Sequence, residues 1–229
     1  MNYCKHNILL LILPTMERLI AKPGSPSVTR LKKEAQRLFA QRGIDGVTVR
    51  DIANAAGQKN PAAVGYHFGS KEGLIRELVV DGAKIIDDRR NAELDALEAS
   101  GGPENIAQIV DILIFPAIDL AAEGETDSFN RFLKMLTMAH RQLFVDALDG
   151  RWNSGYQRCL QHLRKLMPGL DNAKQNQRFI FMEEYLNGVL SARETRLEDA
   201  SRVHPIWNET SILQHFAATL THMLAMPGD

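Results

Sequence analysis

The sequence of 229 residues is poor in cysteine and in aromatic side chains, and it has no long apolar run. Its two cysteines, Cys4 and Cys159, exclude a disulfide framework and a zinc module built on cysteine. The apolar run Ile8–Leu13 is far shorter than the roughly 18–20 residues of a membrane-spanning helix. No cleavage site of small residues follows it, so we expect no export signal, no membrane partner and a cytoplasmic location.

The first residues are unusual for a structured domain. Residues 1–26 are expected to be a disordered extension, or one wrongly included in the reading frame. Met16 would open a more ordinary N-terminus, and the sequence leaves open whether Met1 or Met16 is the true start.

Charge is unevenly distributed along the chain. The formal net charge of -1 by itself disfavours a nucleic-acid partner. Residues 1–82, however, hold 12 Lys and Arg against 7 Asp and Glu, whereas residues 83–229 hold 15 against 21. A basic first third on an acidic remainder indicates one part that meets polyanions and one that does not.

Apolar residues recur at helical spacing, and no stretch shows the alternation of a half-buried strand, so we predict an all-α fold. A continuous helix over about 70–100 is expected, with Ser70 as its cap, and Asp171 should cap a later one. Thr29 is a plausible cap for the first helix. Pro116 lies inside a helical pattern and should kink or split that helix.

Residues 29–75 predict three short helices. The first ends at Gly43, and Thr48-Val49-Arg50-Asp51 resembles a capping box at the start of the second. The third should begin near Asn60–Pro61, where proline suits a first helical turn. A helix, a tight turn and a second helix, with a preceding helix against them, form the helix-turn-helix architecture.

This segment resembles the DNA-binding domain of the TetR family of bacterial transcriptional regulators. The resemblance rests on Ala35, Leu38, Phe39, Gly43, Gly46, Thr48, Ile52, Ala53, Ala56 and Gly57, and above all on the run from Tyr66 to Leu74. It implies an N-terminal helix-turn-helix domain over 27–75, joined to a larger helical domain over 76–229 that binds an effector and dimerises. Gly65 stands where many members have a base-facing tyrosine, and one extra residue lies between Gly57 and Phe68.

The resemblance places the third helix in the major groove of double-stranded DNA. We expect Lys59, Asn60 and Ala63 near the bases, the alanine methyl against a thymine methyl. Phosphate contacts are expected from Thr48, Arg50, Tyr66, His67 and Lys71, with Lys71 at a helix N-terminus that favours anions. Lys32 and Lys33 would add distant attraction. The plainer alternatives are that Tyr66 is a core aromatic and Lys71 a solvated lysine.

In the family, the last two long helices form a four-helix bundle between two copies. Here they would span about 171–197 and 208–225. The expected interface residues are Phe181, Tyr185, Gly188, Ala192, Phe216 and Leu220, unless their stripes face only the core of one chain.

The residues of the effector pocket cannot be identified from the sequence. Large apolar residues are candidates for its lining, or else for plain core: Phe115, Met135, Met138, Trp152 and Met182. His215 and His222 share a helix face, and Asp119 and Glu123 lie one turn apart, but neither pair has a third ligand at fixed spacing. We expect no metal and no cofactor.

These observations predict a ligand-responsive homodimeric transcriptional regulator, a repressor that leaves a palindromic operator when an unknown small molecule binds. Activation instead of repression stays open. The alternative from another class is a small helical enzyme with an accessory helix-turn-helix, although the sequence holds no G-x-S-x-G, H-E-x-x-H, Walker or G-x-G-x-x-G motif. A DNA binder without sequence preference is a third possibility, disfavoured by the modest basic charge.

Overall fold

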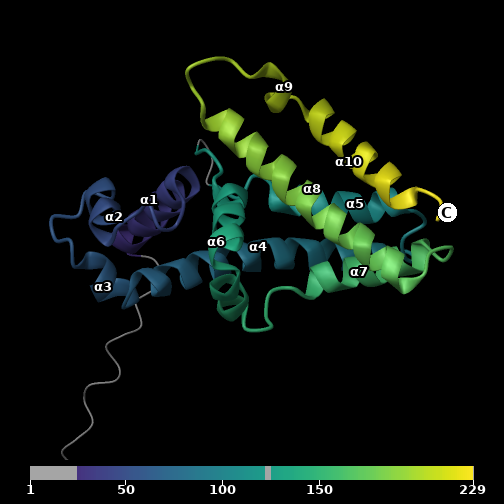
Figure 1. Ribbon diagram of the computed structural model, residues 1–229, viewed down its shortest axis with the longest axis horizontal. Coiled ribbons are helices and arrows are strands. Elements are labelled where there is room, and N and C mark those ends of the chain that lie inside the picture. Colours follow the sequence, from purple (N-terminus) through teal and green to yellow (C-terminus); the bar gives the residue numbers. More distant parts are fainter. Residues whose placement is uncertain (1–24, 122–124, 229) are drawn as a thin grey trace, which may run out of the picture.

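A computed structural model describes residues 25–121 and 125–228 of the chain, so nearly all of the predicted extension lies outside it. The described residues form helices and contain no strand (Figure 1). No described helix is both long enough and apolar enough to cross a membrane. In chain order the helices are α1 (Pro26–Arg42), α2 (Val49–Ala55), α3 (Ala63–Phe68), α4 (Lys71–Ala99), α5 (Ile106–Ile114), the 3-10 turn η1 (Phe115–Ala117), α6 (Phe129–Leu148), α7 (Ser154–Leu166), α8 (Asn172–Glu198), α9 (Pro205–Asn208) and α10 (Thr210–Ala225).

The first three helices begin and end at capping residues. Ser25, not Thr29, caps α1, because the Ser25 hydroxyl accepts the N–H of Val28 and Pro26 takes the first helical position. Gly43 ends this helix with a φ of 74°, a conformation that favours glycine. Thr48 caps α2 in the predicted capping box, with Asp51 in the fourth position.

Helix α4 leaves the three-helix unit and runs the length of the C-terminal helices (Figure 1). Ser70 caps it by accepting the N–H of Gly73, and the helix continues to Ala99, as predicted. Gly82 is buried in its middle, where the Phe129 ring of α6 takes the space that a side chain would need. The linking helix therefore packs tightly on α6.

The predicted break at Pro116 is confirmed. Helix α5 ends at Ile114, and the chain turns through η1 with Pro116 in its first positions. Asp171 caps α8 by accepting the N–H of Lys174, also as predicted. The long α8 and α10 run side by side, and the C-terminal end of α8 reaches the end of α1 through a hydrogen bond from Gln41 to Glu198 (Figure 1).

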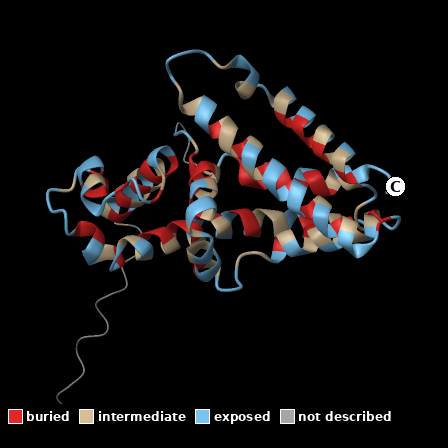
Figure 2. Cartoon of the chain, in the orientation of Figure 1, coloured by how far each residue is buried: buried red, intermediate tan, exposed pale blue. Residues whose placement is uncertain are grey.

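One hydrophobic core runs through the whole described fold. Buried faces turn inward along α1, α4, α6 and α8 (Figure 2). Phe39 of α1 stacks on Phe132 of α6 with ring centroids 6.0 Å apart. The three-helix unit is therefore held to the C-terminal helices by packed side chains as well as by α4.

Candidate functional site

The α2–α3 unit presents one exposed face. Ile52 and Ala53 of α2 and Val64 of α3 are fully buried, where α2 packs on α1 and α3 packs on α4. On the opposite side of α3, Gly65 is exposed and the Tyr66 side chain is 78 % exposed. A short helix with its apolar side fixed and its other side free has the geometry of a recognition helix.

Most of the residues predicted to contact DNA are exposed to solvent. The exposed ones are Thr48, Arg50, Lys59, Asn60 and Tyr66, with His67 half-buried beside Tyr66. The rings of Tyr66 and His67 meet edge to face, with centroids 4.9 Å apart. Within the described residues, Arg50 and Lys59 form no ion pair, so both cations are available to phosphate.

Two of these residues also fix the local backbone. The Thr48 hydroxyl accepts the N–H of Asp51 at 3.2 Å and donates to its carboxylate at 2.6 Å. The hydrogen bonds from Thr48 lower the pKa of Asp51, which keeps the capping carboxylate charged. The Asn60 side chain accepts the N–H of Ala62 at 2.9 Å, which shapes the turn before α3. These bonds set the angle at which both helix starts face the solvent.

The prediction that Ala63 reads bases is not supported by its position. Helix α3 begins at Ala63, two residues later than the Asn60–Pro61 start that we expected. Ala63 is only 9 % exposed and packs in the core, whereas Ala62 is exposed. Ala62, just before α3, and Gly65 within it are the small residues exposed to solvent here.

Three lysines expected near phosphate have partners within the protein. Lys71 donates to the Ile44 carbonyl at 2.7 Å and lies over the Phe39 ring, 5.8 Å from its centroid. Its position at the start of α4 is as predicted, but its ammonium ties α4 to the turn between α1 and α2. Lys32 pairs with two carboxylates of α4, and Lys33 pairs with Glu125.

Sequence comparison identifies this unit. Residues 32–78 match the family described as "Bacterial regulatory proteins, tetR family". Residues 32–78 thus have the sequence of a TetR-family domain. The TetR-family domain thus covers α2, α3, most of α1 and the start of α4.

A curated relative extends this likeness only locally. The "HTH-type transcriptional repressor KstR2" of Rhodococcus jostii (strain RHA1) is 45 % identical over 51 residues. These residues are 22 % of this chain and 24 % of KstR2, so the match spans about a quarter of the relative.

Two solved structures share the fold over most of their length. AmtR of Mycobacterium smegmatis has a TM-score of 0.58 at 18 % identity, with 92 % of this chain and 91 % of AmtR covered. The TetR family transcriptional regulator PfmR of Thermus thermophilus has a TM-score of 0.52 at 19 % identity, with coverage of 85 % and 97 %. At these identities the likeness establishes the fold, a TetR-family domain followed by a larger helical part.

The expected interface residues divide into two groups. Phe216 and Leu220 are 4 % and 0 % exposed, so they belong to the core of one chain and were wrongly assigned to an interface. The residues expected from α8 are exposed instead. Phe181 is 59 % exposed, Tyr185 is 36 % exposed and Gly188 is exposed. Ala192 is half-buried on the same stripe. The Tyr185 ring meets that of Phe216 edge to face, so α10 supports this stripe from behind.

The expected pocket residues do not form a pocket. Met182 is fully buried, Met138 is 73 % exposed and Met135 is 37 % exposed, while Phe115 and Trp152 are half-buried elsewhere. None of the five lines the cavity that the C-terminal helices enclose. A periodic pattern identified them as large and apolar but could not show which of them face a common space.

The cavity lies among α4, η1 and α5–α8 and has a volume of about 240 Å³. Its apolar wall includes Leu113, Leu133, Phe144 and Leu186. Its polar groups come from Arg90, Asn130, Thr137, Asn153, Tyr156, Glu183 and Asn187. Arg90 was not predicted from the sequence, although one signal was present: it lies midway between the buried Ile86 and Leu94 on α4.

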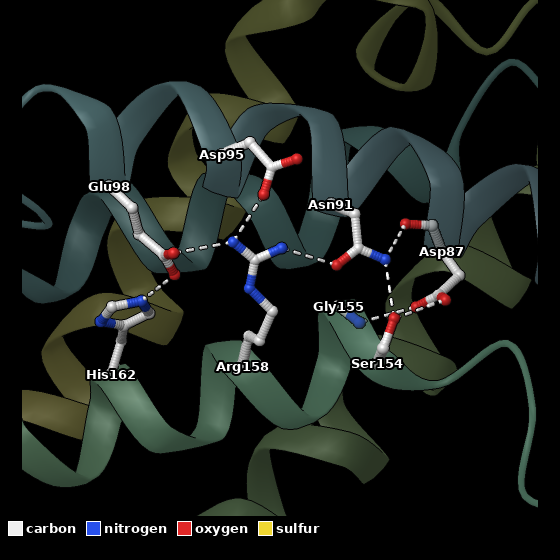
Figure 3. Close-up of polar contacts among 8 residues, drawn as sticks. All are labelled: Asp87, Asn91, Asp95, Glu98, Ser154, Gly155, Arg158 and His162. Carbon is white, nitrogen blue, oxygen red and sulfur yellow. Dashed lines mark hydrogen bonds and ion pairs between the residues drawn. The ribbon is translucent and has the colours of Figure 1, made fainter.

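A row of polar contacts joins α4 to α7 beside this cavity (Figure 3). The Asp87 carboxylate accepts the Ser154 hydroxyl at 2.9 Å and the N–H of Gly155 at 2.7 Å. Further along, Arg158 donates to Asn91 and bridges Asp95 and Glu98, each contact being 2.8 Å. Helix α7 is thereby fixed to the same helix that leads to the TetR-family domain.

No group of three or more metal-binding side chains is placed to hold an ion within the described part of the chain. His215 and His222 are exposed on α10, and Asp119 is exposed before the gap at 122–124. Glu123 falls in that gap, outside the described residues.

Proposed function

We propose that this chain is a homodimeric transcriptional repressor that binds a palindromic operator through α3 and leaves it when a small molecule occupies the C-terminal cavity. The observation that carries the proposal is the exposed face of α2 and α3. There Arg50 and Lys59 lack carboxylate partners, within the part of the chain that the structure describes, beside the bare surface at Gly65.

Dimerisation is supported by the free stripe of α8. Gly188 is exposed in mid-helix, and a side chain there would meet nothing within 4 Å. Glycine costs an exposed helix about 1 kcal/mol relative to alanine, and nothing in a single chain offsets that cost. Close approach of a second copy of α8 would offset it. A twofold dimer would also read two half-sites one DNA turn apart, which one α3 cannot do.

Regulation would follow from the position of α4. It forms one wall of the cavity through Ile86 and Arg90, and its first turn joins the TetR-family domain. A ligand that binds two arrangements of α4 unequally would shift the spacing of the two α3 helices, by no more than its difference in affinity.

The test is DNA binding by the purified full chain. Genome-wide footprinting would supply the operator, and fluorescence anisotropy would compare it with a scrambled palindrome. We expect at least a hundredfold preference for the operator, since specific sites exceed nonspecific ones by roughly 10³ or more. Arg50→Gln with Lys59→Gln should weaken binding to every sequence, whereas Arg141→Gln, an exposed residue of α6, should not.

Equal affinity for operator and scrambled DNA would contradict the proposal and favour a binder without sequence preference. Repression is tested separately with a reporter on the footprinted promoter. Deleting the regulator should raise expression, and a fall would make the protein an activator.

A further inference from the structure

Arg90 is a cation at the wall of the cavity that forms no ion pair with any described residue. One terminal nitrogen of its guanidinium donates to the Leu113 carbonyl at 2.8 Å, and the group lies 5.8 Å from the centre of the Tyr156 ring. Its Nε–H is buried and has no acceptor, and no described carboxylate forms an ion pair with it. Burial lowers the pKa of Arg90, which reflects the cost of keeping this charge away from water.

Two carboxylates of α4, Asp87 and Glu93, favour the charge of Arg90 through space, but neither forms an ion pair with it. Asp87 lies one turn before Arg90 on α4, but it accepts hydrogen bonds from Ser154 and Gly155 at the start of α7 (Figure 3). Glu183 also lines the cavity, yet it is an exposed residue of α8 and makes no ion pair with Arg90. Among the described residues, therefore, no carboxylate is in direct contact with the Arg90 guanidinium.

The rest of the cavity suits a hydrocarbon group. Leu133, Phe144 and Leu186 form the apolar wall, and the amides of Asn153 and Asn187 are further polar groups of the lining. A dry cavity of about 150 Å³ is enough to hold benzene. At about 240 Å³ this one has room for a ring or a short branched chain with one polar group attached.

We propose that the cavity binds a small amphipathic carboxylic acid as its anion, with the carboxylate on Arg90 and the hydrocarbon part against the leucine and phenylalanine wall. This inference rests on the proposed function, because it names the chemical class of the effector. Carboxylate and guanidinium form charge-assisted hydrogen bonds, which are stronger than hydrogen bonds between neutral groups. A neutral ligand of the same shape would leave the Arg90 charge uncompensated.

The test uses matched pairs of probes that differ only in charge. Phenylacetate and phenylacetamide, and hexanoate and hexanamide, are titrated into the full chain without DNA by calorimetry and ligand-observed NMR. We expect each acid to bind at least tenfold more tightly than its amide. Arg90→Met should abolish this preference, Arg90→Lys should keep part of it, and Arg141→Met on exposed α6 should keep all of it.

Equal affinity of acid and amide would overturn the proposal, and so would an acid preference that persists in Arg90→Met. Absence of binding by both acids at millimolar concentration would also overturn it. Circular dichroism of Arg90→Met shows whether it folds; if it does not, Arg90→Lys and the acid–amide comparison on the unaltered chain decide. Because no DNA is present, a chain that binds acids but no operator would sustain this inference while refuting the proposed function.

Discussion

The ring of Phe39 in α1 stacks on the ring of Phe132 in α6, with their planes 29° apart and both side chains fully buried. The ring centroids of Phe129 and Phe132 are 6.1 Å apart. The Phe129 ring occupies the space that a side chain at Gly82 of α4 would need. Leu133, the residue after Phe132, lines the cavity. A rearrangement around a ligand therefore has a route of packed side chains to the TetR-family domain through α6, in addition to the route along α4.

Gly65→Leu tests whether the exposed face of α3 enters the groove. A side chain at this position meets nothing within 4 Å in the free chain, and leucine favours helix more than glycine does. Thermal unfolding should show unchanged or slightly raised stability, by up to about 1 kcal/mol. Operator affinity measured by anisotropy should fall at least tenfold because the leucine would meet DNA. Unchanged affinity would mean that another face of the domain contacts the operator.

Gly188→Leu tests the proposed dimer. The leucine has free space in one chain, so the fold should be kept, but it would separate two α8 helices that pack closely. Light scattering should show a shift from dimer to monomer at micromolar concentration. Gly65→Leu is the matched control, since it makes the same change at an exposed helical glycine far from α8. A dimer that survives the substitution would place the interface elsewhere.

Gly82→Ala should destabilise the fold although alanine favours helix. Its Cβ would lie 2.2 Å from two atoms of the Phe129 ring, which is closer than packed carbons can approach. We expect a loss of about 1–3 kcal/mol in the free energy of unfolding, measured with urea. Adding Phe129→Leu should recover part of this loss, because the smaller side chain leaves space for the alanine Cβ at position 82. Strict additivity of the two changes would show that the residues do not interact.

Glu194 should make stability depend on pH. Burial raises the pKa of Glu194 to about 7. Hydrogen bonds from the N–H groups of Arg131 and Asn130 lower this pKa, but by less than burial raises it. The ordinary value of 4.5 applies to the unfolded chain, so between these values the folded state holds more protons. The contribution of Glu194 to stability is thus full below about pH 4.5 and falls as pH rises through 7, by on the order of 2 kcal/mol.

Glu194→Gln isolates this effect, because glutamine resembles the protonated acid and does not titrate. The stability of the unaltered chain minus that of the variant, from urea unfolding at pH 5 and pH 8, should decrease with pH. A difference that is constant or increases would show that the carboxylate is not destabilised by its burial.

Local features of the fold were predictable from sequence. Thr48 with Asp51, Ser70 and Asp171 act as the expected caps, and Pro116 breaks its helix, because a cap or a proline acts on the backbone within one turn. The Thr29 assignment failed for a related reason. Ser25 lies four residues earlier, next to a proline that suits a first helical turn, and it extends α1 backwards.

Positions that depend on packing between helices were not predictable. Helical spacing showed that Phe181, Phe216 and Leu220 lie on apolar stripes, but only the fold shows that the first faces solvent and the others the core. The lining of the cavity is even harder to predict from the sequence, because it comes from six elements spread over residues 86–190. The assignment of Ala63 failed because the sequence does not show which side of α3 packs into the core.

The ion pairs of Lys32 and Lys33 also bear on how the protein responds to salt. Lys32 is neutralised by Glu77 and Asp81 at 2.7 and 2.8 Å, and Lys33 by Glu125. DNA affinity falls with ionic strength in proportion to the cations that displace condensed counterions from phosphate. A lysine already paired within the protein displaces few of them. The salt dependence of operator binding should therefore be shallower than the excess of 12 basic over 7 acidic residues in the first 82 suggests.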